Sequence, residues 1–234
     1  STGCVRPIDI DHDNDLDLFI GSRISTFNYP ETPHSSILIN DKGTFKEQAD
    51  SAISEIGMIT DAIWQDVDND SWEDLVLVGE FMPISFFKNH EGELKKMPHK
   101  WLDEDNKKTT TEGWWNCIAS ADFDKDGDID FIVGNQGLNG YVRPKEDYPV
   151  YVYNNDFDGN GTYDPLLGQY FEHEGEQILY PIHSREDIKL QFPESKVHFY
   201  TFEDFAKVSF ESLLKIQDLE SETLKATTFA SAYL

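Results

Sequence analysis

An acidic motif that occurs four times is the feature that most constrains this chain. The copies begin at Asp9, Asp66, Asp122 and Asp156, and each has Asp at its first, third and ninth positions and Asp or Asn at its fifth. A short apolar run and a glycine follow each copy. The first three copies start 57 and 56 residues apart, which indicates a repeat architecture.

The residues around the motif predict strands. The runs DLFIG, DLVLVG and DFIVG are rich in β-branched and aromatic residues, and similar runs such as DAIWQD and NCIASAD precede the loops. A unit of about 56 residues with four short strands has the size of one β-propeller blade. We therefore predict a mainly β chain that forms a partial β-propeller of about three blades, the start of another, and a small helical insertion.

The fourth motif breaks the period, because it starts only 34 residues after the third. Each unit also has an apolar run that ends in an asparagine and a glycine-containing turn, at Asn40, Asn89 and Asn154. The fourth motif is therefore interpreted as an enlarged outer hairpin of the third blade. The predicted units are blades over residues 1–57 (acidic loop 9–17), 58–112 (loop 66–74) and 113–180 (loops 122–130 and 156–164), a helical insertion over 181–226, and the start of a further blade over 227–234.

The loops have the composition of calcium sites. Bunched carboxylates repel one another, and Ca²⁺ reverses this because it binds about 6–8 oxygen ligands. We expect the first, third, fifth and ninth side chains to face the ion and the seventh residue to add its main-chain carbonyl. The predicted ligands are Asp9, Asp11, Asp13, Asp15 and Asp17; Asp66, Asp68, Asp70, Trp72 and Asp74; Asp122, Asp124, Asp126, Asp128 and Asp130; and Asp156, Asp158, Asn160, Thr162 and Asp164.

Alternatives to calcium fit the loops less well. An EF-hand needs Glu at position twelve, where these loops have Ile20, Leu77, Val133 and Leu167. Mg²⁺ prefers few protein ligands in near-ideal octahedral geometry. Solvated turns without an ion are the remaining alternative. Three calcium sites are predicted, and for the fourth loop the two interpretations stay open.

The segments ADFDKDGDIDFIVG and QDVDNDSWEDLVLVG resemble FG-GAP/VCBS repeats, the calcium-binding blades of integrin α-subunit propellers and of many bacterial secreted proteins. The run DPLLGQY with YPIHSREDI also resembles VCBS-repeat proteins that carry an ASPIC/UnbV segment. The resemblance implies a propeller of about seven blades, calcium in the strand-connecting loops, and an extracellular or cell-envelope location. Ser71 departs from the family's usual glycine, which predicts a weaker second site.

The net charge of the chain limits the kinds of partner that it can bind. With 19 basic and 45 acidic residues the net charge is -26, which argues against nucleic acid and against anionic membrane surfaces. No apolar run approaches the length of about 20 residues that a membrane helix needs. Cations and basic partners fit this charge. The chain has two cysteines, Cys4 and Cys117, so one disulfide is possible, but their spacing does not require it.

Three functional hypotheses follow. The first is a non-catalytic calcium-binding module for adhesion or for binding a protein or glycan at the cell surface, since no catalytic motif is found. The second is a calcium-assisted enzyme that acts on acidic polysaccharides or phosphate esters with a basic residue such as Arg143, Lys145 or Arg185. The third is a scaffold that recruits a protein through a helix. There are three minor candidate sites. A polar insert explains the cluster His183, Arg185, Glu186 and Asp187 better than an active site does, and Trp114 and Trp115 are more simply core residues than a sugar-binding pair. The loop residues Asn135, Gln136 and Asn139 could bind a glycan, but a turn is the simpler account.

The non-blade segment contains one helix pattern. Thr201 can cap a helix of about 15 residues, and an apolar stripe follows at helical spacing. The stripe consists of Phe202, Phe205, Ala206, Phe210, Leu213 and Leu214. After it, the alternating run TTFASAYL predicts a strand. Three blades do not close a ring, so we expect a larger parent protein, with open edges that invite self-association.

Overall fold

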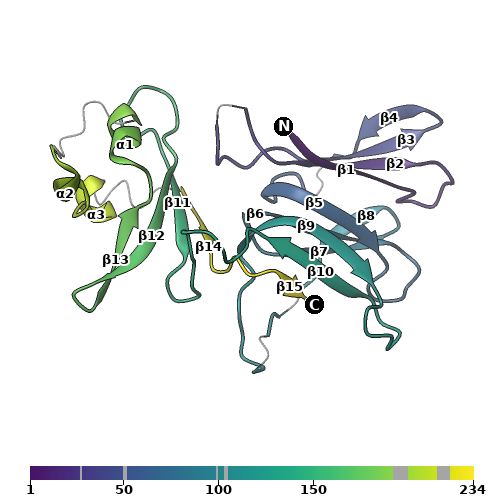
Figure 1. The fold of residues 1–234 in the computed structure, drawn as a ribbon. Coiled ribbons are helices and arrows are strands. Elements are labelled where there is room, and N and C mark those ends of the chain that lie inside the picture. Colours follow the sequence, from purple (N-terminus) through teal and green to yellow (C-terminus); the bar gives the residue numbers. More distant parts are fainter. Residues whose placement is uncertain (27, 50–51, 99, 103–104, 192–199, 215–221) are drawn as a thin grey trace.

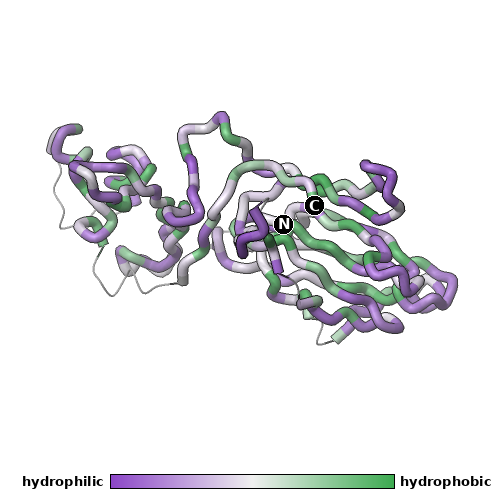
Figure 2. Tube along the Cα trace, turned by 90° about the horizontal axis from the view of Figure 1, so that it is seen from below, coloured by the Kyte–Doolittle hydropathy of each residue, from purple (hydrophilic) through white to green (hydrophobic). Residues whose placement is uncertain are grey.

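A computed structural model describes the chain except for residues 27, 50–51, 99, 103–104, 192–199 and 215–221. It is mainly β, as predicted, with three antiparallel sheets and three short helices among the described residues. Figure 1 shows two parts: a stack of sheets that contains both termini, and a smaller lobe beside it. Figure 2 shows the apolar residues along the strands of the stack and the hydrophilic ones in its loops.

The first blade is a four-stranded sheet in the order β1-β2-β3-β4. Its strands are β1 (Thr2–Ile8), β2 (Asp17–Ser22), β3 (Ser36–Asp41) and β4 (Thr44–Glu47). The first acidic loop joins β1 to β2. In β2 the side chains alternate, so Phe19 is buried while Leu18 and Ile20 are partly exposed, as expected for a sheet with two different faces.

The second and third blades share one sheet. The second blade contains β5 (Met58–Gln65), β6 (Asp74–Met82), β7 (Ser85–His90) and β8 (Glu93–Lys96), and the third contains β9 (Gly113–Ala121), β10 (Asp130–Asn135) and β15 (Ala232–Tyr233). The two are continuous because the end of β6 pairs with the start of β9, where Glu80 lies opposite Trp114. β5 lies beside both β1 and β9, so the first strands of the three blades are neighbours.

The third strand of the third blade is not the one that the sequence predicted. Residues 227–234 were expected to start a further blade, but β15 pairs with β10, with Tyr233 opposite Ile132. The predicted third strand, β11 (Val150–Asn154), lies in another sheet. The prediction was wrong because an insertion separates the second and third strands of this blade. Within the insertion, Asn154 lies about as far from the acidic loop as the asparagine that ends the third strand in the other blades.

This insertion, residues 136–226, is here called the inserted lobe. Its sheet has the order β13-β12-β11-β14, with β12 (Leu166–His173), β13 (Glu176–Pro181) and β14 (Glu222–Ala226). β11 pairs with β14 over five residues, from Val150 opposite Ala226 to Asn154 opposite Glu222. The lobe contacts the blades through a small core that includes Met58, Phe81 and Phe229, and Figure 1 places it at the side of the stack.

The helical part of the lobe also differs from the prediction. The helices are α1 (Arg185–Gln191), α2 (Phe202–Phe205) and α3 (Phe210–Leu213), so the single predicted helix is two short ones. Thr201 caps α2 as expected, in a capping box with Asp204. Ser209, with an extended backbone (φ -73°, ψ 163°), caps α3 and interrupts the helix. Phe210 is buried, whereas Phe202 is 68% exposed.

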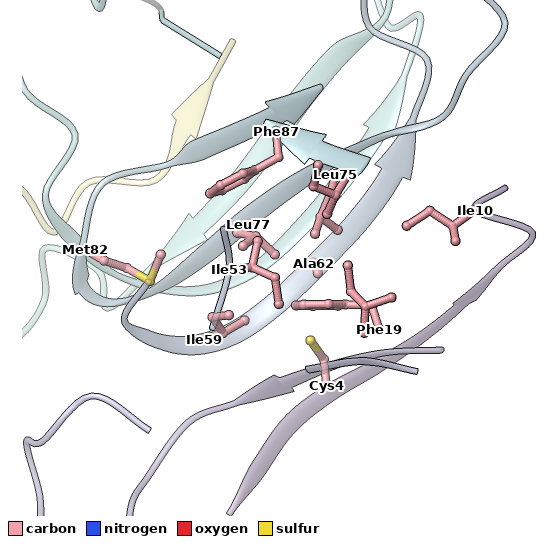
Figure 3. Packing of buried hydrophobic residues seen from close by; sticks show 12 residues of the cluster. Cys4, Ile10, Phe19, Ile53, Ile59, Ala62, Leu75, Leu77, Met82 and Phe87 are labelled. Carbon is pink, nitrogen blue, oxygen red and sulfur yellow. The ribbon is translucent and has the colours of Figure 1, made fainter. Parts of the chain in front are cut away.

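Buried side chains join each blade to the next. Cys4, Phe19 and Ile37 of the first blade pack in one cluster with Leu75, Leu77 and Phe87 of the second, and Figure 3 shows several of these side chains between the two sheets. Val76 and Val78 of the second blade pack in the same way with Ile118, Phe131 and Val133 of the third. The core therefore lies between sheets, which is the packing of a propeller.

Ion pairs reinforce the contacts between blades. Glu80 is 2% exposed and accepts a hydrogen bond from Arg23 Nε at 2.6 Å and one from the Tyr29 hydroxyl at 3.3 Å. Arg6 pairs with Asp61, whose other oxygen accepts from the backbone N–H of Ile118 at 3.1 Å. Asp61 thus links the first strands of all three blades.

Candidate metal centres

The four acidic loops share one pattern of hydrogen bonds. In the first loop the Asp9 carboxylate accepts the backbone N–H of Asp13 at 3.0 Å and of Asn14 at 3.1 Å. The equivalent pair of bonds reaches Asp66 at 3.1 and 2.9 Å and Asp156 at 2.9 and 2.8 Å, and Asp122 accepts from Gly127 at 3.2 Å. The carboxylate of the first aspartate therefore stabilises the curved backbone of the loop.

The fifth residue makes the second shared contact. Its side-chain oxygen accepts the N–H of the seventh residue at 3.0 Å in the pair Asp13–Asp15. The same bond measures 2.9, 3.0 and 2.8 Å in the pairs Asp70–Trp72, Asp126–Asp128 and Asn160–Thr162. The fourth loop, which joins β11 to β12 in the inserted lobe, therefore has the conformation of the other three, although it is not an outer hairpin of a blade.

Each loop needs two residues with a left-handed backbone. The sixth position has positive φ at Asn14 (75°), Ser71 (73°), Gly127 (101°) and Gly161 (88°). The fourth position, which the sequence did not reveal, also has positive φ, at His12 (59°), Asn69 (59°), Lys125 (66°) and Gly159 (77°). Asn69 and Gly159 are the residues that could have indicated it, because Asn and Gly tolerate this region best.

Each loop brings three carboxylates together. In each group, one oxygen from each residue lies within 4.8 Å of the others. The groups are Asp9, Asp11 and Asp13; Asp66, Asp68 and Asp70; Asp122, Asp124 and Asp130; and Asp156, Asp158 and Asp164. Such sets of oxygens suit a hard cation such as Ca²⁺. All the ligand roles stay predictions. The predicted side-chain ligands outside these groups are Asp17, Asp74, Asp126 and Asn160, and the predicted carbonyl ligands are those of Asp15, Trp72, Asp128 and Thr162.

The ninth aspartate has a second role that sequence reasoning missed. Asp17 is fully buried. Its Oδ2 accepts the N–H of Ile10 at 2.9 Å, and its Oδ1 accepts that of Asn40 at 2.8 Å. Asp74 makes the same two bonds, to Val67 at 3.3 Å and Asn89 at 2.9 Å. These carboxylates fasten the loop to the third strand of the blade.

This anchor explains the recurring asparagine at the end of the third strand. Asn89 Oδ1 accepts the N–H of Gly92 at 3.0 Å, which closes the β7–β8 turn. Its Nδ2 donates to the carbonyl of Ile10 at 3.0 Å, in the acidic loop of the preceding blade. Neighbouring loops are therefore connected through buried polar groups.

Crowding of carboxylates has an electrostatic cost. Burial, together with the charges of Asp13 and Asp17, raises the pKa of Asp11. Burial likewise raises the pKa of Asp74 and of Asp164. A raised pKa means that the ionised carboxylate is less stable here than in water, and a bound divalent cation removes that penalty.

The second loop carries a cation of its own. The Lys88 ammonium, on β7, contacts Asp68 and lies 2.8 Å from Asp70 Oδ2. These hydrogen bonds raise the pKa of Lys88 and lower that of Asp70. The second loop is thus partly neutralised without a metal, an effect that the sequence did not indicate.

We expect Lys88→Met to strengthen calcium binding at the second loop. The ammonium would compete with a bound ion for Asp68 and Asp70, and its loss should lower the dissociation constant by about two- to fivefold, the usual range for an exposed pair. Tb³⁺ luminescence excited through Trp72, a residue of this loop, would measure it. Lys46→Met, which removes an exposed lysine that pairs with Asp41 outside the acidic loops, is the matched control. Equal affinities of Lys88→Met and wild type would contradict the competition.

The minor candidate sites have structural roles. His183 Nε2 accepts the N–H of Leu167 at 3.0 Å, Asp187 bonds Ser184 at the start of α1, and Arg185 bonds Glu186 and the carbonyl of Tyr200. Trp115 is 1% exposed, and Trp114 packs on Phe81 and Phe229. The tryptophan pair is core, and the His183 cluster organises the lobe.

His183 should make the lobe sensitive to mild acid. Burial lowers the pKa of His183, so the folded chain favours the neutral ring while the unfolded chain takes up a proton near its ordinary value of 6.5. Stability is then complete above that value and falls as the pH drops below it toward the folded-state pKa. Melting curves at stepwise lower pH should show this loss, and His183→Gln should reduce it. An unchanged pH dependence in His183→Gln would exclude the histidine as its source.

Comparison with known proteins agrees with the repeat. Residues 66–133 match the family model of the FG-GAP-like repeat, a span that holds the second and third acidic loops and confirms the resemblance for that part of the chain. No curated protein and no solved structure matches the chain. Among the described residues, no helix combines the length and apolar character needed to cross a bilayer.

Proposed function

We propose that this chain, with its FG-GAP-like repeat over residues 66–133, is a calcium-binding β-propeller module that binds a protein or glycan at the cell surface without catalysing a reaction. The observation that carries the proposal is the common conformation of the four loops, each with three carboxylate oxygens within 4.8 Å of one another. Unrelated surface turns would not repeat four times the bond between the fifth and seventh residues and the two positions of positive φ.

Calcium fits these loops better than a smaller ion. The loops offer several carboxylates in a wrapped, irregular arrangement, which suits the flexible coordination of Ca²⁺, whereas Mg²⁺ requires near-ideal octahedral geometry and keeps its waters. We expect three strong sites, at the first, third and fourth loops, and a weaker one at the second, where Lys88 occupies part of the carboxylate set.

The surrounding charge bears on the partner. A net charge of -26 favours basic protein surfaces or ligands bridged by calcium, and it disfavours nucleic acid. Arg143 donates a hydrogen bond to Gly140, and Arg185 donates to Glu186 and Tyr200, all within the inserted lobe. Calcium-assisted hydrolysis or elimination needs a basic group beside the ion. Lys88 contacts Asp68 and Asp70 of the second loop, so such an enzyme stays the second candidate function. A location outside the cell or in its envelope, where calcium is abundant, is part of the proposal.

Calorimetric titration of the chelator-treated chain with Ca²⁺ tests the metal. We expect binding at three or four sites, with little heat from Mg²⁺, and the loss of one site in Asp124→Asn. Absence of saturable Ca²⁺ binding would overturn the proposal. Incubation with acidic polysaccharides and with phosphate esters in the presence of calcium tests whether the chain is non-catalytic. Turnover of such a substrate that is lost in Asp124→Asn or Asp158→Asn would refute that part of the proposal.

A further inference from the structure

Each blade has two faces, and the structure shows how they pair. Paired residues of antiparallel strands share a face. In the second blade one face consists of Ala62, Leu75, Leu77, Phe87 and Leu94, all at most 7% exposed, and it packs against Cys4, Phe19 and Ile37 of the first blade. We call these the leading face of the second blade and the trailing face of the first.

The same contact recurs between the second and third blades. The trailing face of the second blade, with Val76 and Val78, packs on the leading face of the third, with Ile118 and Phe131. Phe86 and Phe131 meet edge to face across this contact, with ring centroids 5.6 Å apart. The chain therefore uses one mode of face-to-face packing twice.

Two faces of the same design are open. The trailing face of the third blade carries Cys117, Ile132 and Tyr233, at the positions of Cys4, Phe19 and Ile37 in the first blade. Ile132 and Tyr233 are 44% and 55% exposed, and Cys117 is exposed while Cys4 is buried. The corresponding glycines confirm the equivalence, since Gly21 lies against the Cys4 sulfur and Gly134 against that of Cys117.

The leading face of the first blade is open in the same way. Val5 and Phe45 are each 45% exposed, and Leu18, Ile20 and Leu38 are partly exposed. Their counterparts in the second blade, residues Ala62, Leu94, Leu75, Leu77 and Phe87, are buried. The inserted lobe packs elsewhere, around Met58 and Phe81.

We propose that the open trailing face of the third blade binds the open leading face of the first blade in a second copy of this chain, head to tail. The occupant is identified by continuity with the two interfaces inside the chain, because the open pair repeats their apolar positions. Such a head-to-tail contact is heterologous, and it forms a ring when its rotation closes. Calcium should favour it, since it reduces the repulsion between two chains of net charge -26. The proposal does not depend on the function of the acidic loops.

A designed disulfide tests the geometry. Cys4 and Ile59 of adjacent blades both lie within 3 Å of the same point beside Gly21, and Thr2 is the counterpart of Ile59 in the first blade. Thr2→Cys should therefore form a disulfide with Cys117 of a second copy under mild oxidation. Thr44→Cys, an exposed position in the β3–β4 hairpin, gives the rate of random collision, and Cys117→Ser in the Thr2→Cys chain should return cross-linking to that rate.

The oligomeric state of the unmodified chain tests the faces. Sedimentation with and without calcium should show self-association, and both Ile132→Asp and Phe45→Asp should abolish it. Because both positions are exposed, neither substitution should change the melting temperature of the monomer. A chain that stays monomeric up to its solubility limit in both conditions would overturn the proposal. Association that survives both substitutions, or cross-linking no faster than in Thr44→Cys, would overturn it as well.

Discussion

In excess EGTA the chain should melt at least about 10 °C below its melting temperature in millimolar calcium. Each ion that binds only the folded chain adds stability by mass action, about 2.7 kcal/mol when calcium is a hundredfold above the dissociation constant. Several sites act together, and for a chain of this size each kcal/mol corresponds to roughly 2–4 °C. Differential scanning fluorimetry, followed through the intrinsic tryptophan fluorescence, would measure the shift.

The controls for this experiment separate calcium from ionic strength. Magnesium at the same concentration should restore little of the loss, and returning calcium should restore all of it. Because the carboxylates crowd one another without an ion, added monovalent salt should raise the melting temperature of the chelated chain slightly by screening. Identical melting in EGTA and in calcium would show that the loops fold without a metal and would remove the basis of the proposed function.

The repeat and its loops could be predicted because their signals are local. Aspartates at fixed spacing, a short apolar run and a glycine lie within about 15 residues, so the strand–loop–strand unit is encoded without reference to the rest of the chain. The fourth loop shows the same point, since Asp156 to Asp164 fold as a loop of this kind although they lie outside a blade.

The long-range features could not be predicted in the same way. The residues of β15 do not by themselves indicate that it pairs with β10, which lies on the other side of the inserted lobe in the sequence. A strand's partner depends on which sheet edge the rest of the chain leaves open. The apolar spacing after Thr201 predicted one helix, but Ser209 offers its own cap and competes for the backbone. The anchor role of Asp17 was hidden for a related reason: its partner Asn40 is distant in sequence, and an aspartate that binds N–H groups looks identical to one that binds an ion.

Replacing Asp17 by alanine should destabilise the chain even in the absence of calcium. Its two oxygens accept the N–H groups of Ile10 and Asn40 from a fully buried position. The alanine variant leaves both donors without these partners, at an expected cost of about 2–4 kcal/mol. Urea denaturation in EGTA would measure the difference from wild type.

Asp11→Asn in the same loop is the matched control, and it makes the two roles of the motif separable. Asp11 is an exposed member of the carboxylate group, and burial with neighbouring charge raises its pKa, so removing its charge should leave the chelated chain equally stable or slightly more so. Both variants should bind one calcium ion fewer, but only Asp17→Ala should be less stable in EGTA. If the two variants were equally stable in EGTA, the buried carboxylate would be a ligand and nothing more. If they differ as expected, the ninth aspartate fastens the blade before any ion binds, and the ion then adds its stability to a loop that is already formed.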